Sequence, residues 1–253
     1  MAVPADQVII ESSYNGPPGS GNGGYACGLA AGAFTHGPAE VTLRKPPPLS
    51  VPMALVATGA GAELRDGDTV VASVTPWDGL LDVPAPPSVA AVEAAMRNFD
   101  LPSYADPHPF PTCFTCGPSR EAGSGLGIYP GRPLNGPGVI WHWTPDPSLD
   151  GGDGRVADEI MWAALDCPGG HAWLEDAASG VEPPVVLGRL AARIDRRAAI
   201  GSRYLTMGWQ IGRDGRKLQS GTAVWSEDGE LQALARATWI LLDPEQAAAF
   251  IAV

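Results

Sequence analysis

The pattern of apolar and polar positions divides the chain into two segments with the same order of signals. The first segment opens with a short apolar strand, Val8 to Ile10, followed by a Gly-rich loop and a helix of small residues around Gly24–Phe34. Strand candidates separated by turn residues come next. Their ranges are 39–45, 53–63 and 68–76. This segment predicts one helix packed on an antiparallel sheet.

The second segment repeats that order. A strand candidate at Gly138–Trp143 precedes a polar loop, and a helix is expected at Val156–Asp166, where apolar residues recur at helical spacing. Asp158 and Glu159 fall in its first turn, where negative charge favours the helix dipole. Four strand candidates follow, at 186–196, 202–213, 216–226 and 230–242.

Asp-Gly pairs mark the tight turns of both segments. They stand at Asp66-Gly67, Asp214-Gly215 and Asp228-Gly229, each between strand candidates, as expected of two-residue hairpin loops. A helix with an apolar stripe must bury that stripe against a sheet. We therefore predict an α+β fold of two tandem helix-on-sheet units whose sheets join edge to edge, with the two helices close together.

The predicted domains are 1–95 and 136–253, separated by an ordered linker at 96–135. The Pro, Gly and aromatic content of this linker favours a path along the surface.

Two short motifs carry a resemblance to a known family. The stretch Asp158–Asp166 and the stretch Asn22-Gly23-Gly24-Tyr25 resemble the central helix of hotdog-fold acyl-CoA thioesterases, in particular the phenylacetate-pathway type. In that family His-Gly-Gly opens the helix and a carboxylate follows about two turns later. The resemblance implies a double hotdog, two helices each wrapped by an antiparallel sheet, and hydrolysis of an acyl thioester. This chain has Asn22 where the family has its His.

The two halves carry complementary parts of the family's site. Asn22, Gly23 and Gly24 are the candidates for binding the substrate and its oxyanion, because amides at a helix N-terminus stabilise negative charge. Asp166 is the candidate catalytic base or nucleophile. Eight residues after Gly23 the first helix has Ala31, so only the second half supplies the carboxylate. The plainer alternatives are a flexible Gly-rich loop and a polar helix end.

Three further residues are candidates. Asp166 and His171 are five positions apart, which also resembles the acid–base pair of hotdog enoyl hydratases and leaves a hydratase or dehydratase as an alternative. Arg193 and Arg203 flank a predicted strand and its successor, where they would meet coenzyme A phosphates or pair with acidic neighbours.

Cys113-Phe114-Thr115-Cys116 resembles half of a zinc ribbon. Structural zinc takes four ligands, and the chain contains no second Cys-x-x-Cys pair. We therefore expect no metal and no cofactor, and interpret the motif as a Cys-containing turn. The alternative is a metal held by Cys113, Cys116, His108 and one other residue.

Charge and composition limit the classes of binding partner that this chain is expected to have. The net charge of −12 argues against nucleic-acid or membrane binding through the overall field. The first ten residues lack a signal-peptide pattern, and four Cys are too few for a disulfide scaffold, so a cytoplasmic location is expected. The expected partner is a small acyl thioester linked to coenzyme A or a carrier, in a chain that is a candidate homo-oligomer. The main alternative is a hotdog scaffold that binds a thioester or another apolar ligand without hydrolysing it.

Overall fold

The computed structural model describes residues 7–34, 37–106, 108–174 and 184–251. Ten strands form one sheet in the order β1-β3-β4-β5-β2-β7-β10-β9-β8-β6. The strands of the first half are β1 (Gln7–Val8), β2 (Ala39–Leu43), β3 (Met53–Thr58), β4 (Gly61–Asp66) and β5 (Thr69–Pro76). Those of the second half are β6 (Val139–Trp143), β7 (Val185–Ile194), β8 (Tyr204–Asp214), β9 (Lys217–Ser226) and β10 (Leu231–Leu241).

The two halves of the sheet meet at one strand pair. β2 and β7 run antiparallel, with Val41 opposite Leu190. Both side chains are fully buried, so the joint lies inside the core and no strand edge is left open at the centre of the sheet. The expected edge-to-edge union of two units is confirmed.

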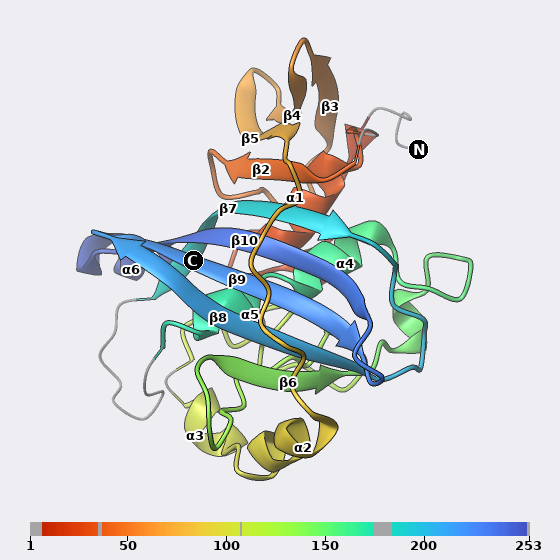
Figure 1. The fold of residues 1–253 in the computed structure, drawn as a ribbon. Coiled ribbons are helices and arrows are strands. Elements are labelled where there is room, and N and C mark those ends of the chain that lie inside the picture. The colour runs from red at the N-terminus through yellow and green to blue at the C-terminus, as the bar shows by residue number, and fades with distance from the viewer. Residues whose placement is uncertain (1–6, 35–36, 107, 175–183, 252–253) are drawn as a thin grey trace.

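One helix from each half lies on the same face of the sheet, and the two are packed together (Figure 1). They are α1 (Gly23–Ala31) and α4 (Asp158–Ala164), and they cross at two glycines of α1. A Cβ on Gly24 would lie 2.6 Å from the Trp162 carbonyl oxygen, and one on Gly28 would lie 2.5 Å from Glu159 Cα. Only glycine permits this close approach of the two backbones.

The opposite face of the second unit is covered by the chain that connects the halves. After β5 the chain crosses this face as an extended segment, gold in Figure 1, and reaches α2 (Val89–Arg97) and α3 (Leu101–Ala105). Trp77, Leu81 and Val83 of this segment pack on side chains of β8, β9 and β10. The part of β8, β9 and β10 that lies under this segment is therefore buried on both faces.

The structure corrects three details of the expected fold. The strand expected at 53–63 is divided into two strands, β3 and β4, which are joined by a turn at Gly59 and Ala60. The helix expected at 156–166 ends at Ala164, and a short helix α5 (Cys167–His171) follows with Pro168 in its first turn. Pro lacks an amide hydrogen, so it starts this helix more readily than it continues the preceding one.

The third correction concerns the linker. Phe114, Thr115 and Ile128 are almost completely buried, so the expectation of a surface path is wrong for this part. Phe114 packs edge-on against Tyr14 and Tyr25, and this aromatic contact draws the segment into the core. α2 runs across the boundary that was expected at 95/96. The limits of the two domains stay a prediction.

Within the described residues, the structure contains no helix of the length and apolar character that crossing a bilayer requires. The first six residues, used in the signal-peptide argument, lie outside the described part.

Replacing Gly28 with Ala should destabilise the fold. The new methyl group would overlap Glu159 and force α1 and α4 apart, at a cost of about 1–3 kcal/mol for an overpacked core. Gly212→Ala on β8 is the matched control, because nothing lies within 4 Å of the added Cβ. Urea unfolding of both variants measures the difference, and equal stability would contradict the close crossing.

Candidate active site

Asp166 stands at the break between α4 and α5, facing the start of α1. Its Oδ2 accepts a hydrogen bond of 2.9 Å from the Gly24 amide, 142 residues away in the sequence. The side chain is 2% exposed. The carboxylate of the second half and the glycines of the first half thus meet in one place, as the division of roles between the halves predicts.

The surroundings of Asp166 favour its protonated form. Burial raises the pKa of Asp166 to about 7, although the Gly24 amide acts in the opposite direction by stabilising the ionised form. The second oxygen, Oδ1, is buried without a hydrogen-bond partner among the described residues. A buried polar atom without a partner is costly and is often found where a ligand binds.

The start of α1 is held by its N-cap residue, Asn22. Its Oδ1 accepts from the Tyr25 amide at 2.9 Å, and its Nδ2 donates to Thr115 Oγ1 at 3.3 Å. Thr115 in turn donates to the Ala163 carbonyl of α4 at 2.9 Å. This chain of hydrogen bonds fixes the position of α1 relative to the end of α4.

A cavity of about 580 Å³ opens beside these residues. Asp166, Asn22 and Gly23 line it, whereas Gly24 does not. The two glycines therefore differ: the Gly24 amide is engaged with Asp166, and Gly23 is the glycine next to the empty space. The apolar side chains of the lining include Leu43, Phe110, Leu174, Leu187, Trp239 and Ile240.

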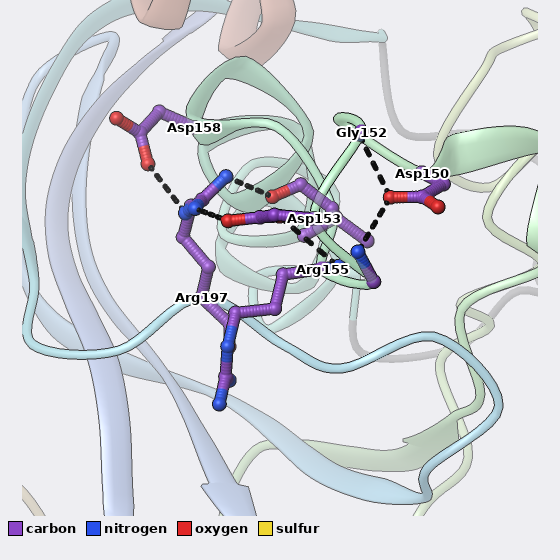
Figure 2. A network of polar contacts seen from close by, with 8 residues as sticks. Asp150, Gly152, Asp153, Arg155, Asp158 and Arg197 are labelled. Carbon is purple, nitrogen blue, oxygen red and sulfur yellow. Dashed lines mark hydrogen bonds and ion pairs between the residues drawn. The ribbon is translucent and has the colours of Figure 1, made fainter.

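The start of α4 offers no equivalent site. Arg197 covers it, with ion pairs to Asp158 and Asp153 and a hydrogen bond to the Val156 carbonyl (Figure 2). Asp150 orders the neighbouring loop by accepting from the Gly152 amide at 2.8 Å. Asp158 is exposed and turns toward Arg197 in this network. The residues of the candidate site therefore come from both units and meet at the start of α1.

Arg193 and Arg203 do not join this site. Arg193 pairs with Asp195 and donates to the Gly79 carbonyl, and Arg203 pairs with Glu227. Neither lines the cavity, because acidic neighbours on the surface hold both guanidinium groups. The cations that line the cavity are Arg44 and Lys45, from the first half of the chain.

His171 lies in the cavity wall on α5. Its Nε2 is 3.3 Å from the Tyr104 hydroxyl, whose oxygen is also 2.8 Å from His108 Nε2. Burial lowers the pKa of His171 to about 3, so the ring is neutral at physiological pH. The hydrogen bonds of Asp166 and His171 are made to different groups. The hydratase pairing of these residues stays a prediction.

Several residues of the wall were not singled out from the sequence as site residues. Arg44 and Lys45 stand before a Pro-rich stretch that suggests only a loop, and Tyr104 lies in the linker. Cys167 follows Asp166 directly and comes to lie next to the Cys113 thiol. The spacing Cys167-x-x-x-His171 is a signal for a metal-ligand pair that a search beyond Cys-x-x-Cys would have found.

No protein-family model matches the sequence, and no curated protein matches it. Two solved structures share the architecture over nearly the whole chain. A hot dog fold protein of unknown function from Alicyclobacillus acidocaldarius is 13% identical, with a TM-score of 0.60 and coverage of 96% of both chains. This chain has the double-hotdog fold. A tesB protein of Mycobacterium avium subspecies paratuberculosis is 14% identical, with a TM-score of 0.50, covering 96% of this chain and 91% of its own.

In this double hotdog, Asn22→Ala should cost more stability than removal of an ordinary N-cap. The variant loses the cap of α1 and also the hydrogen bond to Thr115, so we expect a loss of roughly 2 kcal/mol, the upper range for caps. Ser88→Ala, which removes the exposed cap of α2, should cost about 1 kcal/mol or less. Urea denaturation measures the free energy of unfolding of both variants. Equal losses of stability would show that the hydrogen bond from the Asn22 side-chain amide to Thr115 adds nothing.

Proposed function

We propose that the chain hydrolyses an acyl thioester in the cavity between its two hotdog units. The observation that carries the proposal is the hydrogen bond from Gly24 at the start of α1 to the Asp166 carboxylate, at the wall of a 580 Å³ cavity. A carboxylate and a helix N-terminus are the two elements that thioester hydrolysis needs, a base or nucleophile and a donor for the oxyanion.

The roles follow from the position of each group. The Gly24 amide orients the Asp166 carboxylate, and the amide of Gly23 donates a hydrogen bond to the developing oxyanion at the cavity wall. Asp166 takes a proton from water as the water oxygen bonds to the thioester carbonyl carbon. The C–S bond then breaks, the electron pair leaves with sulfur, and the protonated Asp166 returns its proton to the thiolate.

The cavity suits an acyl group with a phosphorylated carrier. Its apolar wall, which includes Leu187, Trp239 and Ile240, fits an acyl chain. Arg44 and Lys45 are exposed and line the same cavity, which places two cations where the phosphates of coenzyme A or of a carrier-linked thioester would lie.

Asp166→Asn keeps the shape of the side chain and removes its charge. Hydrolysis should fall by about 10²-fold or more, the range for losing a general base. Asp158→Asn is the control, because that carboxylate is exposed, pairs with Arg197 and does not line the cavity. Thiol release from a panel of short, medium, long and aromatic acyl-CoAs measures the rates.

Unchanged hydrolysis by the Asp166→Asn variant would remove Asp166 from the mechanism. Binding of acyl-CoA by the wild type without hydrolysis of any member of the panel would instead favour the non-catalytic scaffold.

The double variant Arg44→Ala/Lys45→Ala should separate carrier recognition from chemistry. We expect KM for acyl-CoA to rise by roughly fivefold for each cation, since an exposed charge contact is worth about 1 kcal/mol. KM for an N-acetylcysteamine thioester, which lacks the phosphates, should not change. Arg213→Ala in the β8–β9 hairpin is the control, because Arg213 does not line the cavity. Equal effects on both substrates would contradict the phosphate assignment.

A further inference from the structure

Three thiols from two distant segments of the chain converge in the wall of the cavity. Cys113 and Cys116 come from the linker and Cys167 from the start of α5, and their sulfur atoms all lie within 4.8 Å of one another. All three are buried, and none forms a disulfide. Such a cluster is the usual arrangement of thiolate ligands around a soft divalent cation.

The spacing of the sulfur atoms matches a tetrahedral site. Cys113 Sγ and Cys167 Sγ are 3.7 Å apart. Four-coordinate zinc with Zn–S bonds of about 2.3 Å holds its sulfur ligands about 3.8 Å apart. The two thiols therefore already stand at the separation that a shared ion imposes.

His171 is the candidate for the fourth ligand. It lies one helical turn after Cys167 on α5, and one of its ring nitrogens lies within 4.8 Å of Cys116 Sγ, the sulfur that the two groups of ligand atoms share. Its Nδ1 is buried without a hydrogen-bond partner among the described residues. His108 Nε2 lies 3.8 Å from Cys116 Sγ, but His108 is less suitable, because its Nδ1 accepts from the Phe110 amide and the hydrogen of the neutral ring is then on Nε2.

A side-chain amide also contacts one of the thiols. Asn22 Nδ2 lies 3.7 Å from Cys113 Sγ. Amide donors to a ligand sulfur are the outer contacts that tune metal sites. The turn also requires Gly117, since a Cβ there would lie 2.5 Å from the Cys113 amide nitrogen.

We propose that Cys113, Cys116, Cys167 and His171 bind one zinc-type divalent cation. The ion fastens the linker to α5 directly beside Asp166, and so fixes the wall of the cavity between the two units. This replaces the expectation of a metal-free chain, which rested on the single Cys-x-x-Cys pair and left Cys167 out. The proposal does not depend on thioester hydrolysis.

Elemental analysis of the full-length protein, purified under reducing conditions without chelator, tests the site. We expect one zinc per chain in the wild type and loss of at least nine-tenths of it in Cys167→Ser. Cys27→Ala is the control and should keep its zinc, because Cys27 is buried in α1 and belongs to neither group. A metal-free wild type that takes up no added Zn²⁺ under reducing conditions would overturn the proposal.

Cobalt substitution of the wild-type protein provides a second measurement, and this part of the test does not require a folded variant. Co²⁺ added to metal-free wild-type protein should give the intense visible bands of a tetrahedral thiolate site, and one equivalent of Zn²⁺ should abolish them. His171→Ala should weaken Co²⁺ affinity by at least tenfold, whereas His108→Ala should not. The reverse order would overturn the assignment of His171, and weak octahedral bands in the wild type would overturn the site.

Discussion

The crossing of α1 over α4 is the contact on which the rest of this molecule depends. Gly24 and Gly28 bring the two helix backbones together, and the same approach places the Gly24 amide against Asp166. A larger side chain at Gly24 would meet both the carboxylate-bearing residue and the Trp162 carbonyl. Packing of the core and assembly of the candidate site are therefore set by one constraint, the absence of side chains along one face of α1.

The asymmetry of the two halves follows from their helix starts. One half opens its helix with glycines beside a cavity, and the other opens it with acidic residues that Arg197 covers. Duplication of one unit would give two related sites, and here each half has kept a different part. Asp166 has no counterpart at Ala31 of the first helix, which agrees with a single composite site.

The sequence predicted what depends on local signals. The hairpins at Asp66-Gly67 and Asp214-Gly215 have the left-handed glycines that tight turns need, and α1 begins at its expected cap. The meeting of Asp166 with the start of α1 could be anticipated because a family resemblance supplied the long-range geometry.

The linker was harder to predict. Its burial depends on the contact of Phe114 with Tyr14 and Tyr25, about a hundred residues earlier, and no periodicity in a Pro-rich segment reports such a contact. The proximity of Cys167 to Cys113 is likewise a contact between residues far apart in the sequence, which local patterns do not report. The sequence left open whether Arg193 and Arg203 meet a ligand or pair with acidic neighbours, because a count of charges along the chain does not say which cations have acidic neighbours in space.

The joint between β2 and β7 has a consequence for synthesis of the chain. β2 ends at Leu43 and its partner begins at Val185, so the partner reaches the ribosome exit only after the whole intervening chain has been made. At about 5–20 residues per second this delay is roughly ten to thirty seconds. During that time the nascent first unit presents an unpaired strand edge, the surface most prone to wrong association between chains. Glu40 on this strand pairs with Arg189 in the folded protein. Before Arg189 is made, its charge makes the unpaired edge of β2 less apolar.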